Sequence, residues 1–510
     1  MLSKIYSATC FGIDAYVVEI EVDVANGLPQ VTIVGLPDQA VRESKERVRS
    51  ALKNSGFSLA PKKITINLAP ADVKKEGPAF DLAIALGILA SSGYLKKDRL
   101  HEFLFLGELA LDGSLREIKG ALPISNLARR KNFSVVVPES NSKEAGLVDE
   151  ASIFAAKTLK EVTPWLNGEQ DLRRISNSQP EADFESAQKD DVNFSEIKGQ
   201  FHAKRAAEIG ASGMHNLLFI GPPGSGKTMI AKRIPSILPK LSRSEFLEIA
   251  KIQSVAGLIS NGASLSFHRP FRAPHHTISA IGLVGGGSFP RPGEITLSHR
   301  GVLFLDEFPE FRRDAIEALR APIEDGWVLI SRAKMNFVFP AQFFMICAMN
   351  PCPCGYLTSP KRACQCSLVQ IRKYHQKISG PILDRIDLHV EMAPIEYQDL
   401  VNQIPQESSE EIGKRVMESR TIQAERFSGN FAKTNATMTV REIKKFCILT
   451  EAAKKLLERA MKELELSARG YHKILKIART IADLGLSEDI REEHVAEAIQ
   501  YRTLDRQWWG

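Results

Sequence analysis

The chain has 510 residues, a length that corresponds to roughly three or four structural units of ordinary size. Apolar residues make up 44% and charged residues 25%, which is typical of globular proteins and excludes a disordered, collagenous or coiled-coil chain. The 67 Lys and Arg against 61 Asp and Glu leave a formal net charge of only +6, so a surface that binds a polyanion must be local.

Membrane and export signals are missing from the sequence. The longest apolar runs, at 82–90 and 343–349, are far below the roughly 18 residues that a membrane-crossing helix needs. The first twenty residues lack the basic, apolar and small-residue pattern of an export signal. We therefore expect a soluble, cytoplasmic protein without a membrane partner.

The first 166 residues alternate β-rich stretches with helical patterns, which predicts an α/β domain. Strands are expected at 15–24, 31–34, 63–68 and 135–138, and helices at 38–55, 80–92 and 122–131. Residues 167–196 then hold eight Asp or Glu and three Lys or Arg among few aliphatics. Such a composition cannot form a core, and it predicts an acidic linker.

Apolar patterning returns after the linker. Three short apolar runs, at 216–220, 302–305 and 343–349, predict buried parallel strands, so 197–405 is expected to be a second α/β domain. From 406 to 510 the pattern is helical almost throughout, with Ile474, Ala478, Ile481 and Gly485 spaced by three and four residues. This part is expected to be a helical C-terminal domain.

A phosphate-binding loop follows the first of these strands. The segment 221–228, GPPGSGKT, fits the pattern G-x-x-x-x-G-K-[ST] and precedes a helix expected at 229–237. Its glycines let backbone N–H groups surround the β-phosphate, where the helix N-terminus adds its positive end. Lys227 would neutralise the β- and γ-phosphates, and Thr228 would bind Mg²⁺. The predicted nucleotide-binding residues are Gly221, Pro222, Pro223, Gly224, Ser225, Gly226, Lys227 and Thr228.

The second and third strands each end in polar residues that suit ATP hydrolysis. The second ends in Asp306, which can hold Mg²⁺ together with Thr228, and Glu307, which can polarise the attacking water as a general base. The third ends at Asn350, whose amide can orient that water beside the γ-phosphate.

Six further motifs make the reading more specific: RAPHH at 272–276, RPGEI at 291–295, LDEF at 305–308, NPCPCG at 350–355, LDRID at 383–387 and SARG at 467–470. Together they resemble the magnesium-chelatase-like branch of the AAA+ ATPases, and within it the ComM/YifB family, along essentially the whole chain. The resemblance implies a homo-oligomeric, hexameric ring. It also implies that Arg385 completes the ATP site of the neighbouring subunit and that Arg469 is the sensor arginine of a helical lid. A guanidinium suits both roles because it stays charged and forks onto γ-phosphate oxygens.

The N-terminal region carries three motifs of another kind: GLPD at 35–38, KEGPA at 75–79 and FLGEL at 105–109. They resemble the Lon-protease-type domain that precedes the ATPase in this family. Lon proteases carry a nucleophilic Ser and a Lys base, and the corresponding positions here are Ala79 and Leu122. Because a methyl group cannot attack and a leucine cannot accept a proton, we predict an inactive protease fold with a docking or substrate-guiding role.

Two basic regions are candidates for binding a phosphate backbone. Residues 251–300 carry five Lys or Arg, including Arg269 and Arg272, but only one acidic residue, a composition that fits DNA contacts and a solvated loop equally well. A β-hairpin expected at 328–331 and 336–339 has Arg332 and Lys334 at its tip. In related ring ATPases a hairpin at this position enters the pore, where such residues could grip DNA without reading its sequence.

Four of the seven cysteines, Cys352, Cys354, Cys364 and Cys366, lie within fifteen residues. In a reducing compartment this clustering indicates a metal before a disulfide, and four thiolates could hold a structural, tetrahedral Zn²⁺. One residue between the members of each pair is a tight spacing, so zinc and reduced thiols stay open as equal alternatives.

The leading interpretation is an ATP- and Mg²⁺-dependent ring motor that acts on single-stranded or branched DNA without sequence preference. By resemblance it would be a ComM-like helicase that promotes branch migration in homologous recombination during natural transformation. One alternative is the ATPase subunit of magnesium chelatase, which the fused Lon-type domain and the cysteine cluster disfavour. A second is a nucleotide-gated adaptor without motor activity, which the intact Lys227, Asp306, Glu307 and Arg385 oppose.

Overall fold

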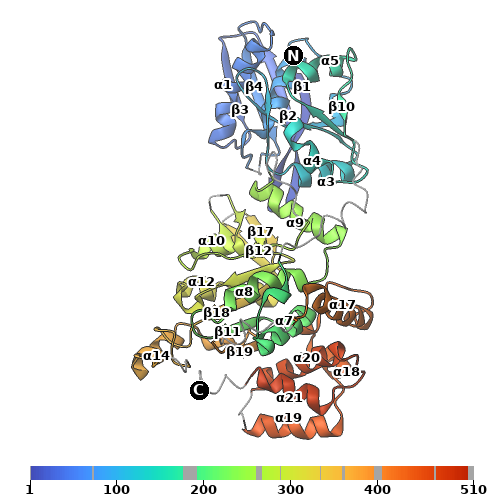
Figure 1. The fold of residues 1–510 in the computed structure, drawn as a ribbon. Helices are drawn as coiled ribbons and strands as arrows, with labels where there is room; N and C mark the ends of the chain where they lie inside the picture. Colours follow the sequence, from blue (N-terminus) through green and yellow to red (C-terminus); the bar gives the residue numbers. More distant parts are fainter. Residues whose placement is uncertain are drawn as a thin grey trace.

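The computed structural model describes residues 2–71, 74–175, 192–259, 267–287, 289–332, 335–358, 362–394, 405–463 and 467–502. They form an elongated molecule in which the N-terminal α/β body, the nucleotide-domain body and the helical C-terminal body follow one another along one axis (Figure 1). The predicted mixed α/β fold class is confirmed. Among these residues, no helix combines the length and the apolar character that a bilayer crossing requires.

The N-terminal body is built on an eight-stranded mixed sheet with the order β10-β9-β8-β5-β1-β2-β4-β3. At its centre β1 (Leu2–Phe11) pairs antiparallel with β2 (Asp14–Ala25), and Ile5, Ile20 and Val22 are fully buried there. The remaining strands are β3 (Gln30–Val34), β4 (Lys63–Ala69), β5 (Phe103–Phe105), β8 (Ser134–Pro138), β9 (Ile153–Ala156) and β10 (Arg173–Arg174). Since β10 pairs with β9, the sheet continues beyond the boundary expected at residue 166.

Helices cover both faces of this sheet. One face is covered by α1 (Gln39–Asn54), the completely buried α2 (Asp81–Ser91) and α5 (Leu159–Asn167). The other is covered by α3 (Ala121–Lys131) and α4 (Ser142–Ala145). A short pair, β6 (Glu108–Leu109) and β7 (Leu115–Arg116), completes the body.

The nucleotide-domain body contains a five-stranded parallel sheet with the order β12-β15-β18-β11-β19. Its strands are β11 (Leu217–Ile220), β12 (Phe271–Arg272), β15 (Val302–Leu305), β18 (Phe344–Met349) and β19 (Leu388–Glu391). Every residue of β11, β15 and β18 is buried, which is why these strands appear in the sequence as continuous apolar runs. The three predicted strands are confirmed.

The helices of this body lie around the sheet: α7 (Phe201–Gly213), α8 (Lys227–Arg233), α9 (Arg243–Ala256), α10 (Ala280–Val284), α11 (Glu294–Leu297), α12 (Arg313–Glu317), α13 (Arg320–Asp325), α14 (Leu368–His375) and α15 (Gly380–Leu383). Two small antiparallel pairs are also present, β13 (Gly285–Gly286) with β14 (Arg291–Pro292), and β16 (Trp327–Arg332) with β17 (Met335–Pro340). The second pair is the predicted hairpin.

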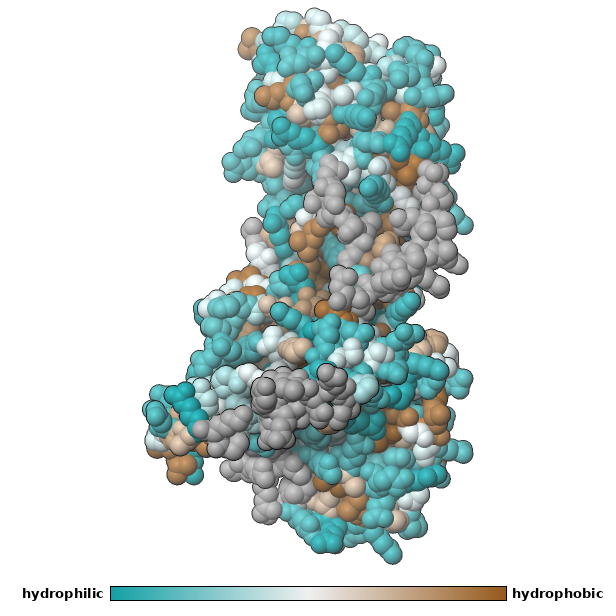
Figure 2. All heavy atoms as spheres, viewed as in Figure 1, coloured by the Kyte–Doolittle hydropathy of each residue, from teal (hydrophilic) through white to brown (hydrophobic). Residues whose placement is uncertain are grey.

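Among the described residues, the N-terminal body touches the nucleotide domain at α9 and at the β16–β17 hairpin. Phe246 and Ala250 of α9 join the apolar cluster beneath α3. At the turn between β1 and β2, Phe11 stacks on Phe337 of the hairpin with ring centroids 4.2 Å apart. Mostly hydrophilic side chains cover the visible faces of the three bodies, with apolar ones scattered among them (Figure 2).

The C-terminal body consists of α17 (Ser409–Arg426), α18 (Val440–Phe446), α19 (Glu451–Glu463), α20 (Ala468–Leu484) and α21 (Glu492–Gln500). Ile474, Ala478 and Ile481 of α20 are buried, as their spacing predicts. Both α17 and α20 pack against α7, so one apolar core joins the helical body to the nucleotide domain.

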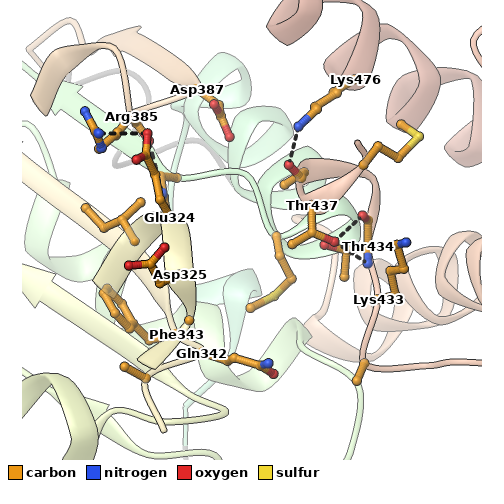
Figure 3. Close-up of a pocket in the computed structure, with 18 of the residues that line it drawn as sticks. Glu324, Asp325, Gln342, Phe343, Arg385, Asp387, Lys433, Thr434, Thr437 and Lys476 are labelled. Carbon is orange, nitrogen blue, oxygen red and sulfur yellow. Dashed lines mark hydrogen bonds and ion pairs between the residues drawn. The ribbon is translucent and has the colours of Figure 1, made fainter. Parts of the chain in front are cut away.

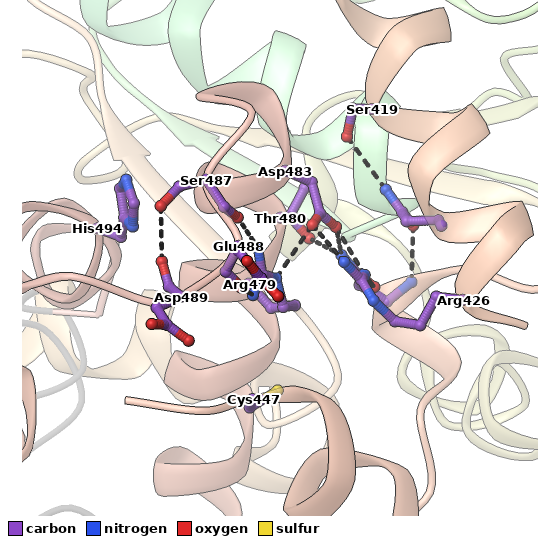
Figure 4. A network of polar contacts seen from close by, with 12 residues as sticks. Ser419, Arg426, Cys447, Arg479, Thr480, Asp483, Ser487, Glu488, Asp489 and His494 are labelled. Atoms are coloured by element: carbon purple, nitrogen blue, oxygen red, sulfur yellow. Dashed lines mark hydrogen bonds and ion pairs between the residues drawn. The ribbon is translucent and has the colours of Figure 1, made fainter. Parts of the chain in front are cut away.

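One buried carboxylate, Asp483 of α20, connects the helices of this body (Figure 4). It accepts hydrogen bonds from Arg426 Nη1 at 2.8 Å, from Arg479 Nε at 3.0 Å and from Asn435 Nδ2 at 2.7 Å. Two guanidinium groups therefore depend on a single carboxylate that water does not reach.

We expect Asp483→Ala to lower the free energy of unfolding by about 3–5 kcal/mol, because Arg426 and Arg479 would stay buried without their counter-ion. Denaturant unfolding followed by circular dichroism measures this loss. Asp489→Ala, at an exposed carboxylate in the same body, is the matched control and should change stability by about 0.5 kcal/mol or less. Equal stability of the two variants would contradict the role of Asp483.

Candidate active site

The predicted P-loop connects the carboxyl end of β11 to the N-terminus of α8. Gly224 and Gly226 have φ angles of +78° and +92°, a region that glycine adopts without strain. The Nζ of Lys227 lies inside the loop and donates to Gly221 O at 2.7 Å and Pro222 O at 2.9 Å. Burial lowers the pKa of Lys227 to about 8, and the nearby Asp306 carboxylate limits the fall.

The two predicted magnesium ligands meet next to this loop. Thr228 Oγ1, in the first turn of α8, donates to Asp306 Oδ2 at 2.8 Å, although the two residues are 78 positions apart in the chain. Mg²⁺ binds hard oxygen ligands and takes few of them from the protein when phosphates supply others. A hydroxyl and a carboxylate side by side at the mouth of a P-loop therefore fit an ATP-bound Mg²⁺.

The candidate general base, Glu307, has an unusual backbone. Its φ is +53°, in the left-handed region, which is uncommon for a residue with a side chain. This backbone conformation turns the chain away from the direction of β15. Its N–H donates to Asp306 Oδ1 at 2.9 Å, and its Oε2 lies 3.1 Å from His276 Nδ1. The sequence alone assigns no role to His276, and the RAPHH motif is the only signal in it that could point to this residue.

Asn350 reaches the same site from the neighbouring strand β18. Its Oδ1 lies 3.4 Å from the Nζ of Lys227. Since β15 and β18 are parallel neighbours, their carboxyl ends place Glu307 and Asn350 at one edge of the sheet beside the P-loop. This arrangement can hold a nucleotide triphosphate and activate a water molecule next to it.

Arg385 and Arg469 lie at the opposite edge of the sheet. Arg385 precedes β19, and its carbonyl accepts a hydrogen bond from Asn216, which directly precedes β11. The P-loop begins at the other end of β11, so Arg385 and its own P-loop are on opposite edges of the sheet. Arg385 therefore cannot contact a nucleotide bound to its own P-loop in this fold.

Both arginines bind the same carboxylate. Glu324, at the end of α13, accepts from Arg385 Nη2 at 2.7 Å and from Arg469 Nη2 at 2.6 Å. All three residues line a cavity of about 720 Å³ between the nucleotide domain and the helical body, part of which Figure 3 shows. No sequence pattern distinguishes Glu324 from other acidic residues at helix ends, so its role could not be predicted from the sequence.

The cavity wall also includes basic residues of α20. Lys473 pairs with Asp387 at 2.9 Å, and Lys476 donates to Ala436 O at 2.7 Å. Lys473 therefore joins the helical body to the nucleotide domain, whereas the Lys476 bond lies within the helical body.

Two of the residues predicted to contact DNA, Arg269 and Arg272, bind acceptors within the protein. Arg269 is mostly buried, donates to Arg300 O at 2.8 Å and pairs with Glu245 at 3.2 Å, so its donors are used within the fold in this conformation. Arg272 forms two hydrogen bonds with Glu294, at 2.6 and 2.7 Å, which neutralise its charge.

The hairpin residues differ from these two. Arg332 is exposed at the end of β16, where its Nη2 donates to Gly287 O at 2.9 Å. Its partner at the tip, Lys334, lies outside the described residues.

The structure brings the four clustered cysteines together, with their Sγ atoms all within 4.8 Å of one another.

The two positions that correspond to the Lon protease nucleophile and base lie in the N-terminal body. Leu122 is completely buried, and Ala79 is half-buried, with its carbonyl accepting a hydrogen bond from Gly107 N–H at 3.0 Å. Ser44, a serine of α1 in the same body, donates its hydroxyl hydrogen to Asp81, which also pairs with Arg47 at 2.8 Å.

A parallel sheet with a P-loop after one strand and an acidic pair after another is typical of P-loop nucleotide-hydrolysing proteins, the class to which the AAA+ ATPases belong. Comparison with known families agrees: residues 193–400 match "Magnesium chelatase, subunit ChlI", residues 20–141 match "Subunit ChlI of Mg-chelatase" and residues 406–502 match "Magnesium chelatase, subunit ChlI C-terminal".

Competence protein ComM of Haemophilus influenzae is 44% identical over 510 residues, which cover 99% of this chain and 98% of that protein. YifB of Escherichia coli is 42% identical over 507 residues, again 99% and 98%. The chain therefore belongs to the ComM/YifB family of magnesium-chelatase-like AAA+ ATPases, as the motifs predict. Lon protease 2 of Bacillus subtilis is 28% identical over 169 residues, 32% of this chain and 30% of that protein, in line with the Lon-like resemblance.

Proposed function

We propose that this protein is an ATP-hydrolysing, hexameric ring motor that acts on DNA, a ComM-like helicase that promotes branch migration in homologous recombination during natural transformation. The observation that carries the proposal is the position of Arg385 on the sheet edge opposite the P-loop, because such an ATP site is completed only by a second copy of the chain. Similarity along the whole chain to a competence protein supports DNA as the substrate.

The residues of one subunit would bind the nucleotide and activate water. The P-loop amides and Lys227 hold the phosphates, and Thr228 with Asp306 holds the Mg²⁺ that shields their charge. Glu307 accepts the proton of the attacking water, which Asn350 orients. The neighbouring subunit supplies Arg385 and Arg469, which exchange Glu324 for the γ-phosphate when the ring closes.

The division of labour follows the domain order. We propose residues 1–166 as an inactive Lon-like docking domain, 167–196 as an acidic linker, 197–405 as the motor and 406–510 as the lid. The hairpin with Arg332 and Lys334 would contact the DNA backbone in the pore, and Phe11 of the docking domain rests on that hairpin. ATP, Mg²⁺ and a structural Zn²⁺ at the four cysteines would be the cofactors of this cytoplasmic protein.

ATP hydrolysis by the purified protein tests this function. The rate is measured alone, with single-stranded DNA, with a four-way junction and with protoporphyrin plus Mg²⁺. A large stimulation by both DNAs and none by the porphyrin is the expected result. Stimulation by the porphyrin alone would indicate a chelatase subunit, and stimulation by none of the three would indicate a nucleotide-gated adaptor.

The hairpin gives a second, sharper expectation. Arg332→Ala together with Lys334→Ala should weaken DNA binding for every sequence and reduce the salt slope by roughly one to two units, at about 0.7–0.9 per lost phosphate contact. Basal ATP hydrolysis should stay the same, because neither residue touches the nucleotide site. Binding titrations at several salt concentrations measure the slope.

The matched control removes two lysines far from the hairpin. Lys454 and Lys455 are exposed on α19, so Lys454→Ala with Lys455→Ala changes the net charge equally and should keep the salt slope of the parent. If the hairpin variant also kept that slope and moved DNA strands normally, the hairpin would have no part in gripping DNA.

A further inference from the structure

The four clustered cysteines have the geometry of a site for a single metal ion. The Sγ of Cys352 lies 3.3 Å from that of Cys354 and 3.6 Å from that of Cys364, and Cys354 and Cys364 are also 3.6 Å apart. Four thiolates at about 2.3 Å from a tetrahedral Zn²⁺ are separated by about 3.8 Å. The three separations among Cys352, Cys354 and Cys364 lie within about half an ångström of this value, and Cys366 Sγ lies within 4.8 Å of the other three.

These separations argue against a disulfide and against a cluster of several metal ions. A disulfide needs its sulfurs about 2.05 Å apart, and all four cysteines are free thiols. A cluster of several irons would spread its ligands more widely than one ion does. Tetrahedral coordination by sulfur alone then favours Zn²⁺ over harder divalent cations.

Backbone amides around the sulfurs complete the site. The N–H groups of Gly355 and Leu357 donate to Cys352, and those of Tyr356 and Gln365 donate to Cys354. The N–H of Cys366 donates to Cys364 Sγ at 3.4 Å. Such bonds disperse the negative charge of metal-bound thiolates and fix their orientation.

The same loop touches the nucleotide site at two points. Asn350, two positions before Cys352, lies with its Oδ1 3.4 Å from Lys227 Nζ, and its N–H donates to the Tyr374 hydroxyl. Gly355 packs on the P-loop so closely that a Cβ there would lie 2.7 Å from Pro223 Cδ. The cysteine loop thus packs directly against the P-loop.

Little besides the cysteines holds this loop in place. Between the end of β18 at Met349 and the start of α14 at Leu368, the described residues form neither helix nor strand, and only Pro351, Cys352 and Gly355 among them are buried. Pro351 O accepts a hydrogen bond from His375 Nε2 at 3.0 Å, which secures only the beginning of the loop.

We propose that Cys352, Cys354, Cys364 and Cys366 bind one structural Zn²⁺ and that this ion holds Asn350 and Gly355 in position against the P-loop. Loss of the metal then loosens the nucleotide site without removing any residue that contacts ATP. Only the consequence for hydrolysis rests on the function proposed above. The metal site and its effect on the loop stand on the geometry alone.

The metal is tested first, on the full-length protein purified under reducing conditions. Elemental analysis should find one Zn²⁺ per chain, and replacement by Co²⁺ should give the absorption bands of tetrahedral thiolate coordination. Cys364→Ser with Cys366→Ser should abolish both signals. Cys10→Ser, at a thiol that only donates to Gly120 O in the N-terminal body, is the control and should keep both.

The coupling is tested by amide hydrogen exchange, with and without a zinc chelator and after Zn²⁺ is added back. Chelation should speed exchange at 350–357 and in the P-loop by about tenfold or more, leave the sheet of the N-terminal body unchanged, and be reversed by Zn²⁺. Chelation of the parent protein keeps this test valid even if the double serine variant does not fold.

Two results would overturn the inference. Less than one Zn²⁺ per chain after reconstitution would refute the metal site. If the untreated protein holds one Zn²⁺ per chain but chelation leaves amide exchange in the P-loop unchanged, the coupling would be refuted. A protein that binds one zinc and shows the coupled exchange, but does not hydrolyse ATP, would instead refute the proposed motor function and leave this inference intact.

Discussion

Glu307→Gln should bind ATP with nearly the affinity of the parent and hydrolyse it about 10²–10⁴-fold more slowly, the usual loss when a positioned base is removed. The amide keeps the size and the polar character of the side chain but cannot accept a proton from water. Glu307 follows β15, and its backbone N–H, which the substitution keeps, donates to Asp306. The substitution therefore leaves the proposed Mg²⁺ ligands, Thr228 and Asp306, unchanged.

Two measurements separate hydrolysis from binding. Steady-state phosphate release gives the rate, and titration with a fluorescent ATP analogue gives the affinity. Lys227→Ala should show the opposite pattern and lose nucleotide binding itself, because its ammonium lies among the P-loop carbonyls where the phosphates would be neutralised. Hydrolysis at the parental rate by the Glu307→Gln protein would show that another group is the base.

Arg385→Ala should reduce hydrolysis by about 10³-fold or more, because an arginine supplied by a neighbour stabilises charge in the transition state. The Arg385→Ala and Glu307→Gln subunits should complement each other when they are mixed in one ring. In a mixed ring, an Arg385→Ala subunit still offers an intact Glu307, and a Glu307→Gln subunit still offers an intact Arg385. In an equal mixture about one quarter of the interfaces should join the two intact halves and regain activity.

Hydrolysis measured across mixing ratios should therefore rise to a maximum near equal proportions and fall to the low rates of the single variants at both ends. Arg320→Ala is the matched control, since this half-exposed arginine lies on α13 with Glu324 but pairs with Glu317. It should keep the parental rate. If labelled subunits demonstrably form mixed rings and no ratio restores hydrolysis, Arg385 does not act between subunits.

Local sequence patterns predicted the strands and the P-loop because both depend on neighbouring residues. The apolar runs that form β15 and β18 are buried on both faces. The P-loop glycines lie within eight positions of Lys227 and Thr228, so the whole motif is visible in one short segment. The helix expected at 229–237 ends as an α-helix at Arg233 and continues as a tighter turn, because Pro235 lacks the N–H that an α-helix would use.

Contacts between distant residues could not be predicted in this way. Arg269 looked like a solvated basic residue in a glycine-rich segment, but its acceptors, Arg300 O and Glu245, come from separate parts of the chain. Glu324 matters because Arg385 and Arg469 converge on it from two other elements. The stacking of Phe11 on Phe337 joins two domains, and no periodicity within either domain reports it.

In the proposed function, ATP hydrolysis at these shared sites moves DNA. The most direct test is branch migration of a synthetic four-way junction by the purified protein, with strand products separated by native gel electrophoresis. We expect conversion with ATP and Mg²⁺, none without ATP, and none by the Glu307→Gln protein, which should still bind the junction. Normal ATP hydrolysis together with an unmoved junction, under conditions where the protein is bound to it, would show that the protein is not a branch-migration motor.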